Sequence, residues 1–386
     1  MAMAACLVLT FGMGALHAFS ALMEPIEQAT GAGRLAVSLV YSAALLSLTA
    51  AVFFGHKLYR RFNASSLVLL AAALPILGIP LTLTGTWAGW IVGYGLLFGF
   101  ASGAGYGFAL HSASFAVPAH RRGLAIGATT AFYGLGAFGF SLLYPALLAA
   151  LGLAAGYAAS TIIVAGLASV SATLFFASRL TTNVSIDEPN AAGSSGGLLR
   201  LWLGYGMGAF AGLLVLGHAV PIILASGNST SAAIAGLAMV SLGNAMAGLC
   251  AGLIADRFGS RRPLVVVATI SAIALAGLTY TSDPQTTVAL IGTVGATYGA
   301  FIALYPLLVS TWSGADRAAW AYGRVFTAWG LAGVAAQPVA GWLYEVTGQY
   351  YVALTIACLF SLGAAAIIAF VGQDRNEAFE RVLGES

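Results

Sequence analysis

The chain has 386 residues and a formal net charge of +3; 60% of the residues are hydrophobic, 7% are charged, and the mean hydropathy is +0.93. A soluble domain is about half apolar and a quarter charged, so this composition excludes a soluble globular protein and predicts an integral membrane protein. The apolar runs are long rather than alternating, which argues against a transmembrane β-barrel, and the small positive charge gives no reason to expect a nucleic-acid partner.

Twelve apolar segments follow one another along the chain, each long enough to cross a bilayer as a helix. They cover residues 2–22, 36–54, 66–83, 88–117, 123–150, 154–177, 199–224, 232–255, 263–280, 287–309, 321–344 and 350–371. The first segment starts at the N-terminus, without a basic stretch before it or a cleavage site after it, so we expect a first span rather than a cleaved signal peptide. The prediction is an all-α membrane protein with twelve transmembrane helices.

The longest connection divides these segments six and six. It covers residues 179–198 and contains the run Gly193-Ser194-Ser195-Gly196-Gly197, a composition typical of a flexible linker. Three features repeat between the halves at offsets of 192, 197 and 196 residues: Gly103 with Gly295, Gly55 with Gly252, and Arg121 with Arg317. A nearly constant offset indicates a duplicated unit, so we expect two pseudo-symmetric six-helix bundles, over residues 1–178 and 199–386, joined by a cytoplasmic linker over 179–198.

The basic residues predict the orientation of the chain. With the N-terminus inside, fourteen of the fifteen lysines and arginines fall in inner loops or in the C-terminal tail, and only Arg34 falls in an outer loop. By the positive-inside rule both termini then lie in the cytoplasm. We expect a multi-pass, monomeric protein of a plasma membrane, the inner membrane of a bacterium.

Two histidines lie inside predicted spans, where an ionisable side chain is costly and is therefore a candidate for function. His17 is in the first segment and His218 is in the seventh, 201 residues apart, and each is followed by alanine and a bulky apolar residue. In a duplicated protein, two imidazoles at matching depth would face one central cavity, where they would contact substrate or carry a proton. The alternative is that each histidine only hydrogen-bonds a neighbouring helix.

A polar stripe runs along the first segment. Its members follow one another in steps of three or four and share one helix face: Thr10, Met13, His17, Ser20 and Glu24. Glu24 precedes Pro25 near the outer surface, where it either accepts a proton during coupling or is a solvated charge at a helix end. Arg34 is its expected partner.

One short stretch concentrates charge between the eighth and ninth segments. It reads Gly252-Leu253-Ile254-Ala255-Asp256-Arg257-Phe258-Gly259-Ser260-Arg261-Arg262. The positive-inside rule accounts for the arginines, but not for Asp256 or the two glycines. The pattern G-x-x-x-D-R-x-G-x-R-R resembles the loop signature of the major facilitator superfamily of secondary transporters. The resemblance implies an inner gate held by Asp256, Arg257 and Arg261, with Arg60 in the degenerate first copy of the motif.

The same resemblance implies a substrate cleft between the two bundles, lined by the fifth and eleventh spans. Tyr133 and Trp329 lie in those two spans. Arg324 lies one turn inside the eleventh span, where it either anchors the inner surface or turns inward as a partner for an anion. With the two histidines and Asn244 of the eighth span, these residues form the predicted substrate site.

Several stretches are similar to the monocarboxylate and oxalate–formate branch of this superfamily. They are Gly31-Ala32-Gly33-Arg34-Leu35-Ala36-Val37-Ser38, Pro118-Ala119-His120-Arg121-Arg122-Gly123-Leu124-Ala125, Leu201-Trp202-Leu203-Gly204-Tyr205, Gly217-His218-Ala219 and Tyr322-Gly323-Arg324-Val325-Phe326-Thr327-Ala328-Trp329-Gly330. The chain departs from that branch in one respect. Those carriers pair a basic residue inside the eighth or eleventh span with the substrate carboxylate, whereas this chain has Asn244 and Trp329 there.

The expected function is therefore a secondary transporter that moves a small organic acid, a monocarboxylate, by alternating access together with protons. Two alternatives stay open: a carrier for a neutral solute or a soft metal cation such as copper, for which Met13 and His17 would be a ligand pair, and a membrane sensor that transports nothing. The sequence contains no P-loop and no nucleophile–base pair, and Cys6, Cys250 and Cys358 are scattered. We expect neither an enzyme nor a cofactor or resident metal.

Overall fold

The computed structural model describes residues 1–371 apart from 56–57, 59–62, 119–121, 179–194 and 314–317. Within these ranges the regular secondary structure is entirely helical, as the composition predicted. The first half contains α1 (Ala2–Met13), η1 (Gly14–Ala18), α2 (Ser20–Thr30), α3 (Arg34–Phe53), α5 (Ala64–Leu83), α6 (Trp87–Trp90), η2 (Ile91–Phe98), α7 (Gly99–Phe115) and α8 (Arg122–Ser178). The second half contains α9 (Ser195–Ala225), α10 (Thr230–Phe258), α11 (Arg261–Tyr280), α12 (Pro284–Ser313), α13 (Ala318–Thr347) and α14 (Tyr351–Phe370).

These elements make twelve passes across the molecule. In the described part of the chain, nine helices are long and apolar enough to cross a membrane, or ten if the bent pair of α1–η1 with α2 is counted as one span. Two more passes come from the geometry of individual helices. The long α8 reverses direction at Gly152, which has a φ of 76°, and so contains two passes. The thirty-residue α13 is long enough to cross as well.

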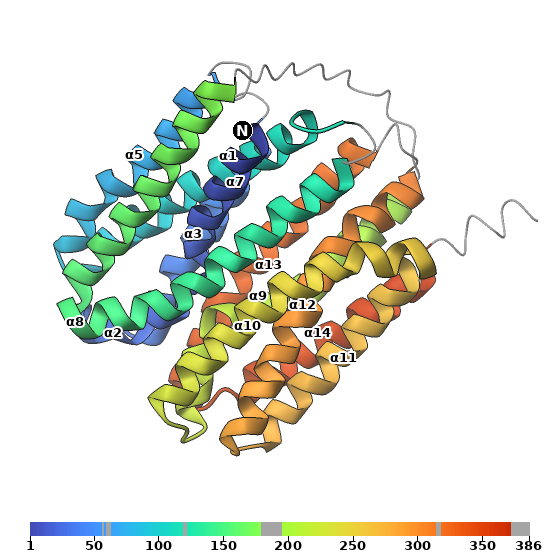
Figure 1. Cartoon of the computed structure of the whole chain (residues 1–386). Helices are drawn as coiled ribbons and strands as arrows, with labels where there is room; N and C mark the ends of the chain where they lie inside the picture. Colours follow the sequence, from blue (N-terminus) through green and yellow to red (C-terminus); the bar gives the residue numbers. More distant parts are fainter. Residues whose placement is uncertain (56–57, 59–62, 119–121, 179–194, 314–317, 372–386) are drawn as a thin grey trace, which may run out of the picture.

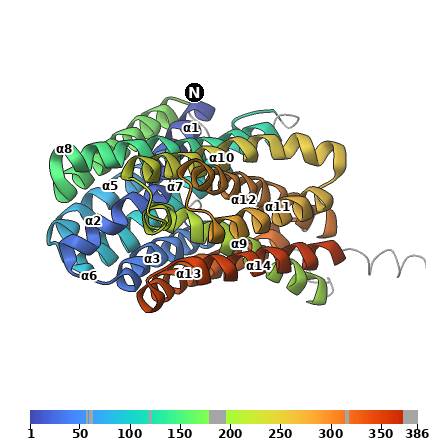
Figure 2. The ribbon, with the colours of Figure 1, turned by 90° about the horizontal axis from the view of Figure 1, so that it is seen from below.

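The passes form two bundles that meet along one interface (Figure 1). Across it α8 packs against α10, and α3 packs against α13 (Figure 2). The two contacts are equivalent under the repeat, because α3 and α10 are the second passes of their halves, while α8 and α13 contain the fifth passes. A site between the halves can therefore take side chains from these four helices, which meet at the interface.

The repeat seen in the sequence has a structural counterpart in two close helix crossings. A Cβ atom placed on Gly103 would lie 2.7 Å from Cα of Leu48, and one placed on Gly295 would lie 2.6 Å from Cα of Val240. No real side chain fits at such distances. Gly295 follows Gly103 by 192 residues, and Val240 follows Leu48 by the same number, so glycine brings the second and fourth passes of each half together at the same point.

The first pass is broken, which the sequence did not predict. The helical segments Ala2–Ala18 and Ser20–Thr30 are inclined by 51°, and η1 between them is a tight 3₁₀ turn. The pass also continues to Thr30, eight residues beyond the predicted end at Leu22. Such turns inside a helix often mark functional positions, and His17 lies in this one. The polar stripe expected along a continuous helix is therefore divided.

Candidate functional site

A cavity lies between the two halves and is lined by both. Its volume is about 70 Å³, taken as the space open to the centre of a water molecule. The first half contributes His17, Leu48, Tyr106, Thr130, Ala131, Tyr133 and Gly134. The second half contributes Asn244, Ala245, Gly248, Tyr298, Gly299, Ile302, Phe326 and Trp329. Four residues predicted from the sequence, His17, Tyr133, Asn244 and Trp329, therefore lie around one space.

The imidazole of His17 is held in place at the cavity wall. Its Nδ1 lies 2.5 Å from the hydroxyl of Tyr41 on α3. The ring of Tyr133 meets it edge-on, with 5.3 Å between ring centres. His17 is only 5% exposed, so this fixed ring presents a small edge to the cavity. Because Nδ1 is engaged by Tyr41, Nε2 is the nitrogen left for a ligand.

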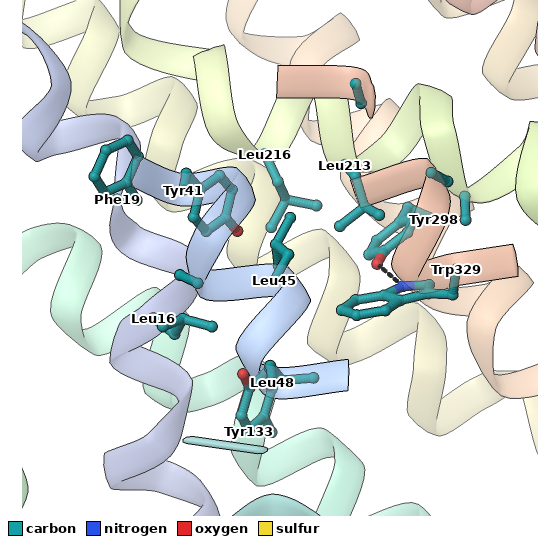
Figure 3. Packing of buried hydrophobic residues seen from close by; sticks show 14 of the residues in the cluster. Leu16, Phe19, Tyr41, Leu45, Leu48, Tyr133, Leu213, Leu216, Tyr298 and Trp329 are labelled. Carbon is teal, nitrogen blue, oxygen red and sulfur yellow. Dashed lines mark hydrogen bonds between the residues drawn. The ribbon is translucent and has the colours of Figure 1, made fainter. Parts of the chain in front are cut away.

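The wall contributed by the second half is built around an aromatic pair. The indole nitrogen of Trp329 on α13 donates to the hydroxyl of Tyr298 on α12 over 2.8 Å (Figure 3). The ring of Phe326 stacks on Trp329 with an interplanar angle of 13°. These contacts fix the orientation of three large side chains from two helices. The wall is therefore rigid, apolar over most of its area, and offers one phenolic oxygen.

Tyrosines supply a second polar edge from the first half. The hydroxyl of Tyr133 lies 3.1 Å from Oγ of Ser102, which in turn donates to the carbonyl of Met13 over 3.0 Å. Tyr106 packs beside Tyr133 with 4.6 Å between ring centres. The cavity thus brings together phenol, amide and imidazole groups, which can donate or accept hydrogen bonds to a small polar solute.

Tyr106 and Tyr298 were not among the predicted site residues. Each is the fourth residue of the repeated stretch, Gly103-Ala104-Gly105-Tyr106-Gly107 in one half and Gly295-Ala296-Thr297-Tyr298-Gly299 in the other. The glycines of this stretch indicate close helix packing. The tyrosine repeated at the same offset of 192 residues is the sequence signal that could have identified Tyr106 and Tyr298 as site residues. Equivalent positions in the two halves face the same central space.

The cavity carries no fixed charge. Lysine, arginine, aspartate and glutamate are absent from its described lining, and His17 is the one side chain of that lining that can become positively charged by taking up a proton. Arg324 is exposed on α13 and does not line this space. Glu24, half-buried on α2, does not line it either. Met13 is buried but is also absent from the lining, so it does not stand beside His17 at the wall.

His218 lies elsewhere, in a separate buried network. It is fully buried, and its nitrogens lie 3.0 Å from the hydroxyl of Tyr350, 3.2 Å from the carbonyl of Gln337 and 3.3 Å from Oγ of Ser38. It does not line the cavity. The structure therefore separates the two histidines that the sequence placed at one depth.

The partner of Arg34 also differs from the prediction. The guanidinium forms a bidentate ion pair with Glu27, in which one of the two bonds measures 2.7 Å, rather than a pair with Glu24. Glu27 is one turn further along α2, and the continuation of that helix to Thr30 brings it beside Arg34. The first pass was predicted to end too early for this partner to be considered.

Part of the predicted inner gate lies outside the described residues. Arg60 is among the undescribed residues, and for Asp256 the described part is the backbone at the end of α10. The guanidinium of Arg257 is exposed and lies 5.6 Å from the ring of Phe258. Arg261 donates to the carbonyl of Ala369 and so fastens the start of α11 to the end of α14.

Comparison with protein families and curated proteins supports the resemblance seen in the sequence. The model of the "Major Facilitator Superfamily" matches residues 201–383. The chain is 25% identical over 348 residues to the "Uncharacterized MFS-type transporter YhjX" of Escherichia coli, and the alignment covers 85% of this chain and 84% of that protein. It is 29% identical over 225 residues to the "Oxalate:formate antiporter" of Oxalobacter formigenes, an alignment that covers 56% of this chain and 51% of the antiporter.

Solved structures share the fold over nearly the whole chain. A bacterial homologue of the lysosomal transporter Spinster, inward-facing and occupied, superposes with a TM-score of 0.74 at 15% identity and covers 96% of both chains. The D-xylose–proton symporter gives a TM-score of 0.73 at 17% identity over 95% of both chains. At these identities the likeness concerns architecture, and it agrees with the two six-helix bundles described above.

Proposed function

The chain belongs to the major facilitator superfamily of transporters, and we propose that it carries a small monocarboxylate across the bacterial plasma membrane by alternating access, together with one proton. The observation that carries this proposal is the cavity between the halves, which has no fixed charge in its described lining and His17 at its wall. The similarity to the oxalate:formate antiporter of Oxalobacter formigenes supports the choice of a small organic acid.

The charge of the cavity favours a monoanion. A carboxylate taken from water into a dry site is costly unless a positive partner balances it. Among the described lining residues, His17 is the group that can become positive by taking up a proton. One monoanion with one proton on His17 gives a neutral pair, whereas a dianion would leave one negative charge unbalanced. The coupling of one proton to one monocarboxylate follows from this balance.

The size of the cavity favours a solute of a few heavy atoms. A single water needs roughly 10–15 Å³ of space measured in this way. The 70 Å³ of the cavity therefore accommodates only a handful of groups of water size. Formate, acetate and lactate fit within that limit, and a hexose does not. The aromatic wall of Trp329 and Phe326 would face the carbon end of the solute, and Tyr106, Tyr133 and Tyr298 would bond its oxygens.

The orientation and assembly complete the proposal. Arg34 is the lone basic residue of the predicted outer loops, so we place the end of the bundles where α2 meets α3 outside and both termini in the cytoplasm. The cavity is complete within one chain, and we propose a monomer as the transporting unit. Asp256, Arg257 and Arg261, with Arg60, are proposed to hold the inner side. Arg324 is proposed as an anchor at that surface.

Uptake by purified protein in liposomes tests the proposal. With a more acidic outside, we expect radiolabelled lactate to accumulate above its external concentration, and we expect a protonophore to abolish the accumulation. Exchange of His17 for glutamine should reduce pH-driven uptake by about tenfold or more, because the described lining of the cavity then contains no side chain that can become positive by taking up a proton. Exchange of His111, a histidine on α7 outside the cavity lining, for glutamine is the matched control.

A neutral solute is the second candidate, favoured by the same lack of fixed charge. In that case a pH gradient would not drive uptake, and His17→Gln would affect the affinity for the solute without changing any pH dependence. The coupled mechanism would be contradicted if the uptake of lactate did not depend on the pH gradient, or if it were equal in the wild type and in His17→Gln. Liposomes without protein must be measured in parallel, because weak acids also cross lipid unaided.

A further inference from the structure

A continuous chain of hydrogen bonds joins the two halves at the end of the bundles where α2 meets α3. It runs from Glu27 through Arg34 and Tyr350 to His218, and we refer to these four residues as the outer latch. Glu27 and Arg34 belong to the first half, while Tyr350 and His218 belong to the second. The latch therefore crosses the interface that must open for a solute to enter from this side.

Arg34 is the anchor of the outer latch. Its guanidinium is held by both carboxylate oxygens of Glu27, and its NH1 group donates to the hydroxyl of Tyr350 over 2.9 Å. The ring of Tyr344 from α13 lies 4.7 Å below the guanidinium carbon. The ion pair is largely shielded, with 12% of the Arg34 side chain and 16% of the Glu27 side chain exposed. A paired and stacked guanidinium of this kind is a fixed donor.

Tyr350 passes the interaction on to His218. Burial raises the pKa of the Tyr350 hydroxyl, so this group stays protonated at any physiological pH. It accepts from Arg34 and donates its own hydrogen to Nδ1 of His218, 3.0 Å away. The opposite nitrogen, Nε2, lies 3.2 Å from the carbonyl of Gln337, which can only accept, so Nε2 carries the hydrogen. The bonding partners thus select one neutral tautomer of His218.

Further contacts tie the same residues to α3. Oγ of Ser38 lies 3.3 Å from Nε2 of His218 and donates to the carbonyl of Arg34 over 2.7 Å. Next to Arg34, the backbone nitrogen of Leu35 donates to Glu345 of α13 over 2.9 Å. Separating the halves here would therefore break three hydrogen bonds between them together: Arg34 to Tyr350, Ser38 to His218 and Leu35 to Glu345.

We propose that His218 is the pivot of an outer gate rather than a substrate ligand, and that the latch of Glu27, Arg34, Tyr350 and His218 holds the outer side shut while the cavity is loaded or emptied on the inner side. This inference rests on the alternating access proposed above, but not on the identity of the substrate. The two histidines that the sequence paired then have different tasks: His17 faces the cavity, and His218 closes the path to it.

Labelling of one buried cysteine measures the gate directly. Ser42 of α3 is 4% exposed, and its Oγ donates to the carbonyl of Val334 across the interface. It lies one turn deeper than Ser38. In a chain whose three native cysteines are replaced by serine, Ser42→Cys would be treated from outside, in the absence of substrate, with a thiol reagent that cannot cross the membrane. The labelling rate then reports how often the outer side opens.

Tyr350→Phe removes the hydroxyl that receives the bond from Arg34 and gives the bond to His218. We expect labelling to rise about five- to tenfold, the effect of losing one net hydrogen bond that exists only in the closed state. Tyr351→Phe, the same substitution one residue further on at a tyrosine that is 51% exposed, is the matched control and should leave the rate unchanged. Glu27→Gln, which frees the anchor without altering the buried part of the latch, should raise labelling by a smaller factor.

Equal labelling in Tyr350→Phe, Glu27→Gln and Tyr351→Phe would overturn the latch. If Tyr350→Phe did not yield folded protein, Glu27→Gln would decide the question by itself. Because no substrate is present in this assay, increased labelling in a protein that fails to accumulate lactate would sustain the latch and reject the proposed substrate. Lactate uptake by the wild type, combined with unchanged labelling in the latch variants, would support the proposed substrate and reject the latch.

Discussion

The hydroxyl of Tyr41 lies 2.5 Å from Nδ1 of His17, and this contact determines which edge of the imidazole reaches the cavity. Tyr41 is fully buried on α3 and also stacks on Phe19 at an interplanar angle of 9°, so its hydroxyl has little freedom to move away. A ring held in this manner presents Nε2 to the solute in a constant orientation. The hydroxyl acts through His17 and is a positioning group.

Removal of that hydroxyl should impair transport without changing the fold. For Tyr41→Phe we expect pH-driven uptake of lactate to fall roughly tenfold, because the imidazole loses the bond that fixes its orientation. The pH profile of the remaining uptake should also shift, an effect that a purely structural role would not produce. Tyr305→Phe is the control: it removes a buried tyrosine bond of 2.7 Å to the carbonyl of Leu201, in the second half and away from His17. Equal losses in the two variants would contradict the positioning role.

The glycine crossings of the two halves should be intolerant of a methyl group. Gly295→Ala is expected to destabilise the protein by about 1–3 kcal/mol, because its Cβ would overlap the backbone at Val240 and α10 would have to move. Gly103→Ala should have a similar effect at Leu48, since the two positions are equivalent. Thermal unfolding in detergent would measure both.

Gly166→Ala provides the matched control on α8. Its backbone is helical, and apart from its chain neighbours and the backbone of its own helix no atom lies within 4 Å of the position that its Cβ would occupy. Alanine should therefore be neutral there, or should stabilise the helix by up to about 1 kcal/mol. A melting temperature that falls equally in Gly166→Ala and Gly295→Ala would show that helix approach is not the cause.

Asp283 caps the start of α12 and gives a pH dependence of known sign. Its Oδ2 accepts from the backbone nitrogen of Thr286 over 2.8 Å and from its hydroxyl over 2.7 Å, and these bonds lower the pKa of the carboxyl. A carboxyl with a lowered pKa contributes stability that is present above its unfolded value and is lost as the pH falls through the folded value. Asp283→Ala should thus lower the melting temperature slightly at neutral pH, and the difference should vanish in acid. A difference that persisted in acid would indicate another cause.

The architecture was predictable because bilayer physics fixes both the length and the composition of each pass. The twelve segments and the repeat follow from hydropathy and from a nearly constant offset, and neither depends on side-chain geometry. Four of the six predicted substrate residues line the cavity for a related reason. A polar side chain in the middle of a span is costly in contact with lipid and therefore faces the interior of the protein or a cavity.

The position of His218 was not predictable in that way. Its offset from His17 is 201 residues, nine more than the offset of Tyr106 from Tyr298. Nine residues are about two and a half helical turns, which is enough to move a side chain along the helix and onto its opposite face. The bend at η1 adds a further rotation in one half alone. Likewise, the pairing of Glu27 with Arg34 depends on the extra turns of α2, which a hydropathy boundary does not capture.

Asn244 offers the sharpest test of the charge balance, since it lines the cavity from α10 and carries no charge. Asn244→Lys would place a permanent positive charge beside His17. We expect the uptake of oxalate relative to lactate to rise by about tenfold, because the lysine and a proton on His17 together balance a dianion. Uptake of lactate should at the same time become less dependent on pH, since the lysine replaces the proton as the partner of the monoanion.

Asn244→Met separates charge from size in this experiment. Methionine is nearly as long as lysine and reduces the cavity to a similar extent, but it adds no charge. It should lower the uptake of both acids and should not favour oxalate. If Asn244→Lys and Asn244→Met gave the same ratio of oxalate to lactate, selection in this cavity would depend on space alone, and the balance between substrate charge and His17 would be wrong.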